Sequence, residues 1–240
     1  MNYNIERNLT SFFITKPLPC PYLPNKFEQR MVTELSGSDS MLTHETLSQA
    51  GFRRSHNLVY TPMCSNCSAC IAVRTMVNEF EPSASQRRVL RLNKNITAEE
   101  RPAHANLEQF ALFKRYQEER HTDGDMSLMN FNDFQALIEE TRVVTSHISF
   151  FNEFGCLIGG CLVDIMSDGL SAVYSYFDPD YKKNSLGSYM VLWLIQRTQQ
   201  LGLPHLYLGY WINGSQKMAY KDKFFPLEYY TSEGWKSFDK

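Results

Sequence analysis

A succession of apolar segments between residues 143 and 211 constrains the fold of this 240-residue chain more than any other feature. The first two segments flank Asn152-Glu153-Phe154-Gly155, a sequence typical of a hairpin turn. The third ends at Asp178-Pro179, and an amphipathic pattern then predicts a long helix that ends at Gly202. The pattern therefore predicts a strand hairpin, a third strand, a helix and a fourth strand. These elements are expected at residues 143–151, 157–165, 170–177, 186–201 and 205–211.

Two helices are expected ahead of the hairpin, one over residues 107–118 and one starting at Asn130. With them, the order of elements resembles that of the GNAT-like acyltransferases. In those enzymes, the loop and helix amino terminus after the central strand bind a pyrophosphate. The corresponding segment here, Lys182–Ser188, lacks the usual Gly-x-Gly or Gly-x-Ala pattern. An acyl group on another carrier therefore fits better than acetyl-CoA, and CoA-dependent N-acetyl transfer is the weaker alternative.

The first hundred residues differ in character from the rest of the chain. Near Arg101-Pro102, a region rich in turns and cysteines gives way to the two predicted helices. We therefore expect an α+β protein with two domains. Residues 1–102 are expected to form an N-terminal cysteine-containing domain that recognises the acceptor, and residues 103–240 a C-terminal GNAT-like acyltransferase domain.

The sequence also indicates where the protein works. It contains no run of about 18 apolar residues, so neither a membrane span nor a membrane partner is expected. The amino terminus, residues 1–7, lacks a basic segment followed by an apolar one, so export is not predicted. Six cysteines are too few for a disulfide scaffold in a chain of this length. We therefore expect a cytoplasmic protein with reduced thiols.

The cysteines of the first half form a pattern of their own. Cys64, Cys67 and Cys70 follow one another at two-residue intervals, and Cys20 is the remaining one in this half. Four thiolates from two separated segments are a suitable ligand set for zinc or an iron–sulfur cluster. Free, partly buried thiols within a loop are an equally good interpretation. The sequence therefore predicts a candidate metal site and leaves both interpretations open.

Positive charge gathers around the same cysteines. Between Arg53 and Lys94 the chain has seven cations and two acids, a local net charge of 7 − 2 = +5 in a protein whose net charge is −2. A basic region of this size attracts phosphates. The alternative is a solvated helix face around Arg87–Lys94.

Several rare residue combinations occur in order along the chain. They are Cys20-Pro-Tyr-Leu-Pro, Gly51-Phe-Arg-Arg-Ser, Tyr60-Thr-Pro, the cysteine cluster, Val73-Arg74, Phe80-x-Pro-Ser, Ser85-Gln-Arg-Arg, Tyr174-x-Tyr-Phe-Asp-Pro, Ser185-Leu-Gly, Gly209-Tyr-Trp-Ile and Lys217-Met-x-Tyr-Lys. On these motifs, which extend from residue 20 to residue 221, the chain resembles the aminoacyl-tRNA–protein transferases of the arginyltransferase family. It is most similar to their bacterial leucyltransferase branch.

The resemblance implies transfer of an amino acid from its tRNA to the N-terminal Asp or Glu of a protein, which marks that protein for N-degron degradation. In the bacterial branch the donor is leucyl-tRNA, whereas eukaryotic relatives use arginyl-tRNA, which is the alternative donor here. Because the aminoacyl ester is already activated, the transfer requires no cofactor. Those relatives carry further cysteines where this chain has Leu23 and Ser68, so the resemblance does not extend to an identical metal centre.

Candidate catalytic residues lie at the end of the third predicted strand, where GNAT-like enzymes have their active site. Tyr174 and Tyr176 would donate hydrogen bonds to the oxyanion of a tetrahedral intermediate, and Asp178 would hold or deprotonate the incoming amine. The alternative is that both tyrosines pack on one face of the strand and that Asp178 caps a turn.

Candidate binding residues are mostly cations. The planar guanidinium of Arg53, Arg54 or Arg74 suits bidentate binding of an acidic side chain, although an internal ion pair is the alternative for one arginine of a pair. Phosphate contacts with tRNA and stacking on its bases are assigned to Arg87, Arg88, Arg91, Lys217, Tyr220 and Lys221. A metal-stabilised RNA-binding module without transfer activity is the non-enzymatic alternative.

Overall fold

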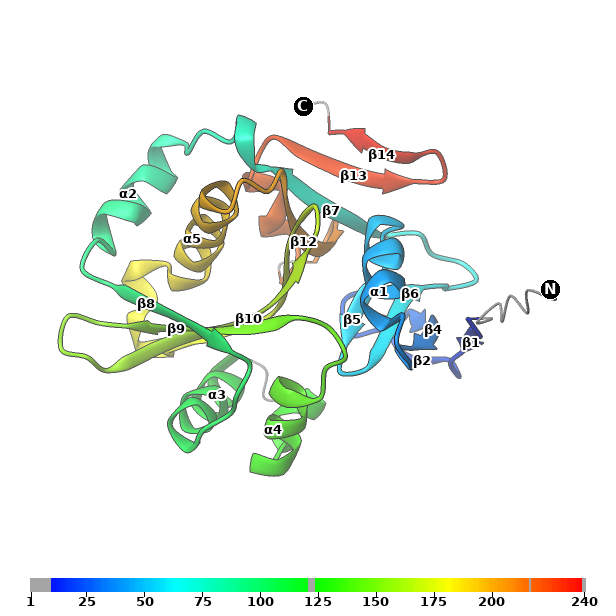
Figure 1. Ribbon diagram of the computed structural model, residues 1–240, viewed down its shortest axis with the longest axis horizontal. Helices are drawn as coiled ribbons and strands as arrows, with labels where there is room; N and C mark the ends of the chain where they lie inside the picture. Colours follow the sequence, from blue (N-terminus) through cyan, green and yellow to red (C-terminus); the bar gives the residue numbers. More distant parts are fainter. Residues whose placement is uncertain (1–9, 121–123, 216, 239–240) are drawn as a thin grey trace, which may run out of the picture.

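The computed structural model describes residues 10–120, 124–215 and 217–238, and it shows one large sheet between helices with a small sheet beside it (Figure 1). The prediction that the protein is not exported rests on the amino-terminal segment, and residues 1–9 lie outside the described residues. Within the described ranges, no helix is long and apolar enough to cross a membrane.

The large sheet has eight strands among the described residues, and its centre is built from the elements predicted over residues 143–211. β9, β10 and β11 are antiparallel neighbours, whereas β12 lies parallel to β11 and is connected to it through α5 (Leu186–Gln200). Across the sheet the order is β14 (Gly234–Ser237), β13 (Leu227–Thr231), β7 (Cys70–Met76), β12 (His205–Ile212), β11 (Gly169–Phe177), β10 (Leu157–Met166), β9 (Thr145–Phe151) and β8 (Thr97–Pro102).

The parallel pair β11 and β12 separates after a short contact. The two strands pair only from Gly169↔His205 to Ser171↔Tyr207. β12 then continues beside β7 with a register shift between Tyr207 and Gly209, where Gly209 has a φ of 79°. The sheet therefore opens between its two central parallel strands. Together with the helical crossover, this opening gives the GNAT-like core that the sequence predicts, and the α+β class is confirmed.

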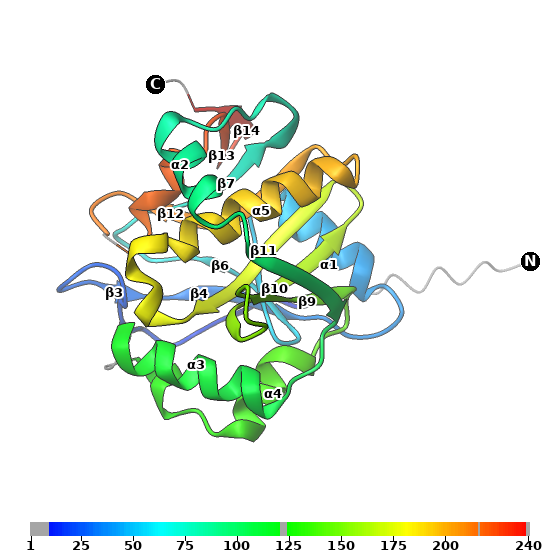
Figure 2. The ribbon, with the colours of Figure 1, turned by 90° about the vertical axis from the view of Figure 1, so that its left-hand side faces the viewer.

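Helices cover both faces of the large sheet (Figure 2). α3 (Leu107–Arg120) and α4 (Phe131–Glu139) lie on one face, and α5 lies on the other beside α2 (Ala84–Leu92). Each face has its own apolar core, one formed around α5 and one around α3 and α4. Capping boxes at Asn130 and Ser83 begin α4 and α2, because each side chain accepts a backbone N–H of the first turn.

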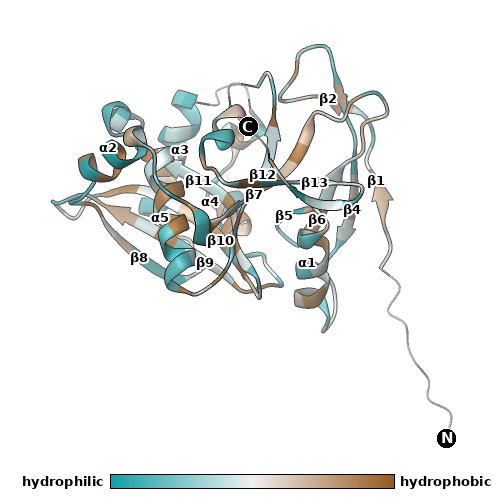
Figure 3. Cartoon of the chain, turned by 90° about the horizontal axis from the view of Figure 1, so that it is seen from above, coloured by the Kyte–Doolittle hydropathy of each residue, from teal (hydrophilic) through white to brown (hydrophobic). Residues whose placement is uncertain are grey.

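The small sheet comes from the first 62 residues and stands beside β7, β12 and β13 (Figure 3). Its strand order is β1 (Phe13–Ile14), β4 (Arg30–Glu34), β6 (Leu58–Pro62) and β5 (Arg53–Ser55), and a separate two-stranded pair contains β2 (Leu18–Pro19) and β3 (Phe27–Glu28). α1 (Ser40–Gln49) precedes β5, and the helix ends just before Gly51, which has a φ of 81°.

The division between sheets does not follow the predicted domain boundary at residue 102. β7 and β8 lie before that boundary, yet both belong to the large sheet. The chain enters the large sheet at Cys70, at the end of the cysteine cluster. The sequence placed this segment in a loop because its cysteines and Arg74 obscured an apolar strand, Ile71-Ala72-Val73.

Candidate functional site

A cavity of about 790 Å³ lies where β11 and β12 separate. Its walls come from the small sheet, α3, α5, both central strands and η4 (Ala219–Lys223). One group of lining side chains is apolar and includes Leu137, Val173, Met190, Val191, Leu194 and Leu208. The cavity can therefore bury an aliphatic side chain.

Positively charged side chains predominate around this cavity. Five cations line it, namely Arg53, Arg54, Arg120, Lys217 and Lys221. Among the described lining residues Asp125 is the one acid, and it is exposed. The cavity is consequently suited to anionic groups and uncharged side chains, and unsuited to a further cation.

Arg53 bridges the two strands at the point where they part. From β5, its Nη1 donates a hydrogen bond to Ser171 Oγ at 2.9 Å and its Nη2 donates to the carbonyl oxygen of Ala172, both on β11. On the β12 side, a Cβ added to Gly209 would lie 3.0 Å from Arg53 Nε. Arg53 is 9% exposed, and within the described ranges it has no acid within ion-pair distance.

Lys221 is buried in the wall of the same cavity, with 6% of its surface exposed. Its Nζ donates a hydrogen bond to the carbonyl oxygen of Tyr210 at 2.7 Å. Burial and the nearby charge of Arg53 lower its pKa to about 7. The sequence assigns Lys221 to contacts with tRNA phosphate, and the structure places it in the cavity wall and not on the surface.

Tyr174 presents a hydrogen-bond donor to the cavity. Gln117 of α3 donates from Nε2 to the Tyr174 hydroxyl oxygen, so the hydroxyl proton is free to point elsewhere. Burial raises the pKa of Tyr174, so the phenol keeps its proton at neutral pH. Tyr174 can therefore act as a donor to a developing oxyanion, as predicted for it, and cannot act as a base.

Tyr176 and Asp178 lie elsewhere. Tyr176 is 1% exposed in the core under α3 and α4, and its hydroxyl is 2.9 Å from His147 Nε2. Asp178 follows β11, accepts the backbone N–H of Asp180 and forms an ion pair with Arg115 at 2.5 Å. Neither residue lines the cavity. Tyr176 therefore packs in the core and Asp178 caps a turn, which are the alternatives stated above for these residues.

Arg54 belongs to a buried ion pair. Its Nη2 and Nε lie 2.6 Å and 2.7 Å from the two carboxylate oxygens of Asp164 on β10, which is 0% exposed. His44 Nε2 lies 3.3 Å from the same carboxylate. Burial alone would raise the pKa of Asp164, but hydrogen bonds from His44 and Arg54 lower it to about 2. Arg54 thus anchors the small sheet to the large one and has no charge left for an acceptor.

Arg74 is also occupied. Its Nε lies 2.6 Å from Glu228 Oε2, its Nη1 donates to the Tyr207 hydroxyl at 2.9 Å, and its guanidinium stacks 4.4 Å from the centre of the Trp235 ring. It lines neither this cavity nor the cysteine cavity described below. Arg74 therefore joins β7 to β13 and β14.

The remaining candidates for RNA contacts fall into two sets. Arg87, Arg88 and Arg91 are exposed on α2, which packs against α5. Lys217 and Tyr220 line the cavity. These two sets of residues therefore lie in different parts of the structure, one on α2 and one at the cavity.

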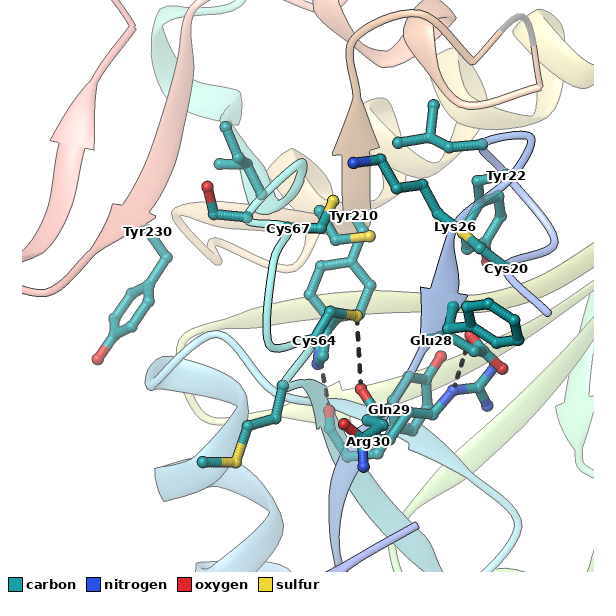
Figure 4. A pocket seen from close by; sticks show the side chains of 18 residues that line it. Cys20, Tyr22, Lys26, Glu28, Gln29, Arg30, Cys64, Cys67, Tyr210 and Tyr230 are labelled. Atoms are coloured by element: carbon teal, nitrogen blue, oxygen red, sulfur yellow. Dashed lines mark hydrogen bonds and ion pairs between the residues drawn. The ribbon is translucent and has the colours of Figure 1, made fainter. Parts of the chain in front are cut away.

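A second cavity, of about 340 Å³, is lined by the four cysteines Cys20, Cys64, Cys67 and Cys70 (Figure 4). Burial and the other three thiols raise the pKa of Cys70 to about 11, so this thiol is protonated at neutral pH. In the part of the chain that the structure describes, no group of three or more His, Cys, Asp or Glu residues is arranged to hold a metal ion. The thiols have the right chemistry for zinc or an iron–sulfur cluster, but their placement does not fit one as it stands.

The cysteine cavity adjoins the larger cavity. Tyr22, Tyr60 and Tyr210 line both cavities and form the wall between them. Tyr210 also donates hydrogen bonds to the carbonyl oxygens of Gly51, at 3.2 Å, and Tyr60, at 3.1 Å. The cysteine cluster thus lies behind the wall that carries Arg53.

Gln117 and the apolar lining were missed from the sequence. The lining side chains lie on the same apolar elements as core residues, namely β11, β12 and α5. Hydrophobic periodicity alone therefore cannot distinguish cavity residues from core residues. For Lys221 a signal was available, because Tyr220 and Phe224-Phe225 make its surroundings apolar.

The GNAT-like core and the cavity between its separating strands together define an acyltransferase. Family models agree with the motifs: the one for the arginine-tRNA-protein transferase N terminus matches residues 18–88, and the one for the C terminus matches residues 108–231. The chain belongs to this family and is an aminoacyltransferase.

Individual relatives are similar over nearly their whole length. An aspartate/glutamate leucyltransferase of Paramagnetospirillum magneticum is 51% identical over 227 residues, which cover 95% of this chain and 93% of that protein. One of Gluconacetobacter diazotrophicus is 48% identical and covers 100% of this chain and 92% of that protein. Among solved structures, FemX is 10% identical with a TM-score of 0.49, over 82% of this chain and 68% of that one.

Proposed function

We propose that this protein transfers leucine from leucyl-tRNA to the N-terminal Asp or Glu of proteins, which directs those proteins to N-degron degradation in the cytoplasm. The observation that carries the proposal is the lining of the large cavity, where aliphatic side chains accompany five cations and one exposed acid. The names of the relatives support the same reaction.

The lining also favours leucine over arginine as the transferred residue. A leucyl side chain can be buried against the aliphatic wall, and it gains about 25 cal/mol for each Å² removed from water. Arg54 is neutralised by Asp164, but an arginyl side chain would still bring a further cation next to the other four, with Asp125 as the one acid among the described lining residues. Charge repulsion in a partly buried site is costly, so the arginyl donor is the weaker candidate.

The chemistry follows from positioning and one hydrogen-bond donor. The neutral α-amine of the acceptor attacks the ester carbonyl carbon, and the carbonyl oxygen becomes an oxyanion. Tyr174, whose oxygen accepts from Gln117, donates its proton to a hydrogen bond with that oxyanion. When the intermediate collapses, the bond between carbon and ribose oxygen breaks. The amine loses a proton, the ribose oxygen gains one, and a peptide bond is left.

The first test is an acylation assay with purified protein. Leucyl-tRNA and arginyl-tRNA are offered separately with peptides that begin with Asp, Glu or Ala. We expect leucine transfer to the Asp and Glu peptides, at least a hundredfold less transfer of arginine, and none to the Ala peptide. Equal use of both donors would contradict the inference that the cavity lining favours leucine. Absence of transfer from both donors would reject the proposed function.

A second prediction concerns the arginines of α2. In a double variant, Arg88→Ala/Arg91→Ala, tRNA binding should weaken, and the slope of log K against log salt should become less negative by about 1.4–1.8, at 0.7–0.9 per phosphate contact. The KM for the acceptor peptide should not change. Arg101→Ala is the matched control, because Arg101 is an exposed arginine already paired with Glu99. An unchanged slope in the double variant would show that α2 does not meet RNA.

A further inference from the structure

Two buried cations line the same part of the large cavity, next to consecutive residues of β12. Arg53 reaches Gly209 from β5, and Lys221 reaches the neighbouring residue, Tyr210, from η4. Both lie where β12 has just parted from β11, and both line the cavity. The charge of Arg53 contributes to the lowered pKa of Lys221, which shows that the two groups act on each other.

The two cations lack the anions that buried charges require. Arg54 has Asp164 and Arg74 has Glu228, but neither Arg53 nor Lys221 has an acid within 4.0 Å among residues 10–120, 124–215 and 217–238. Removing an unpaired cation from water is costly, and a second like charge beside it adds to that cost. Such a pair is stabilised when a ligand supplies negative charge from the cavity.

Both side chains keep hydrogen-bond donors for such a ligand. The guanidinium of Arg53 has five N–H groups, and its hydrogen bonds to Ser171 and Ala172 fix its orientation without using all of them. The ammonium of Lys221 has three N–H groups, of which one is directed at the Tyr210 carbonyl oxygen and one at Met218 Sδ, 3.9 Å away, which leaves one for a ligand. A carboxylate, with about four lone-pair sites, matches this arrangement.

We infer that Lys221 and Arg53 together form the site that binds the side-chain carboxylate of the acceptor's first residue. This inference rests on the proposed function and assigns to it a residue that the sequence had assigned to tRNA. Arg53 fixes the carboxylate through its planar guanidinium, and Lys221 binds it from the other side as a point charge. Because an ammonium imposes less geometry than a guanidinium, the pair accepts the short Asp and the longer Glu.

The charge of Lys221 should make the preference for acidic acceptors depend on pH. The ionisable groups that act on Lys221 are Arg53 from β5 and Cys70 from β7, and the raised pKa of Cys70 keeps its thiol neutral. With a pKa of about 7 in the unliganded protein, Lys221 is charged below pH 7 and neutral above it. The preference for an Asp peptide over an Asn peptide should therefore decrease as the pH rises from 6 to 9. Comparison of two peptides at each pH cancels the titration of their common α-amine.

The test uses the Lys221→Met variant, which keeps the aliphatic stem and removes the charge. We measure leucine transfer to peptides that begin with Asp, Glu and Asn, and the binding of the same peptides without tRNA. The KM and the Kd for the Asp and Glu peptides should rise at least tenfold, while those for the Asn peptide stay unchanged. Lys221→Arg should restore the Asp preference and remove its pH dependence. Lys223→Met, an exposed lysine of the same helical turn, is the control and should behave as the original protein.

The outcomes separate the inference from the proposed function. If the unmodified protein transfers leucine and Lys221→Met keeps the preference for Asp over Asn, the inference is overturned and the function stands. If the unmodified protein transfers nothing but binds Asp peptides through Lys221, the function fails and the carboxylate site stands. An equal loss for all three peptides in a folded Lys221→Met variant also overturns the inference.

Discussion

Replacing Arg53 by Met should reduce kcat/KM for peptides that begin with Asp or Glu by roughly 100- to 1,000-fold, which corresponds to about 3–4 kcal/mol. The reason is that Arg53 presents a buried, oriented guanidinium to the cavity and has no acid of its own among the described residues. The loss should appear in the preference for Asp over Asn, measured in the leucine-transfer assay.

Two control variants accompany this prediction. Because Arg53 also donates to Ser171 and Ala172, thermal unfolding must show that the Met variant is folded. Arg53→Lys keeps the charge and should retain part of the preference. Arg74→Met is the matched control, because Arg74 is paired with Glu228 and lies outside the cavity. A preference that depends on Arg74 and not on Arg53 would show that the acceptor binds elsewhere.

The second large effect is on stability. Asp164→Ala leaves Arg54 buried without its counter-ion, and such a loss costs about 3–5 kcal/mol. For a protein of this size the Tm should fall by roughly 10 °C, measured by calorimetry. The double variant Arg54→Met/Asp164→Leu should recover much of the loss, because replacing both members of a buried pair by apolar residues is often close to neutral. Glu99→Ala, which breaks an exposed pair with Arg101, should leave the Tm almost unchanged.

The same carboxylate predicts acid sensitivity. Its pKa in the folded protein, about 2, lies below the value near 3.9 of an unfolded chain. Its contribution to stability is therefore complete above pH 4 and is lost as the pH falls toward 2. Asp164→Ala should lack this part of the acid dependence. If instead the single variant were as stable as the original protein, the buried pair would not be the anchor between the two sheets.

The second half of the fold could be predicted because its signals are local. Each apolar run from residue 143 to residue 211 is bounded by its own turn, and each run became a strand or a helix at the expected place. The entry of β7 and β8 into the same sheet was not predictable in this way. β7 pairs with β12 and β13, more than a hundred residues later in the chain, and no local pattern reports that pairing.

The roles of the arginines show the same limit. Arg53 and Arg54 are adjacent in sequence and indistinguishable there, but successive residues of a strand point to opposite faces. One therefore faces Asp164, distant in sequence, and the other faces the opening between β11 and β12. Tyr174 and Tyr176 are two residues apart on β11, yet Tyr174 lines the cavity whereas Tyr176 is buried in the core under α3 and α4, next to His147. The residue types predicted the chemistry of the site, but only the three-dimensional structure shows which of these residues line the cavity.

A crystal structure of the protein with two ligands would locate the acceptor and the donor in one experiment. The ligands are a peptide that begins with Asp and a stable amide analogue of 3′-leucyl-adenosine. The account predicts that the Asp carboxylate lies between Arg53 and Lys221, that the leucyl side chain lies against Met190, Leu194 and Leu208, and that the Tyr174 hydroxyl faces the leucyl carbonyl oxygen. An acidic side chain bound in the cysteine cavity or at Arg74, with the opening between β11 and β12 left empty of both ligands, would contradict it.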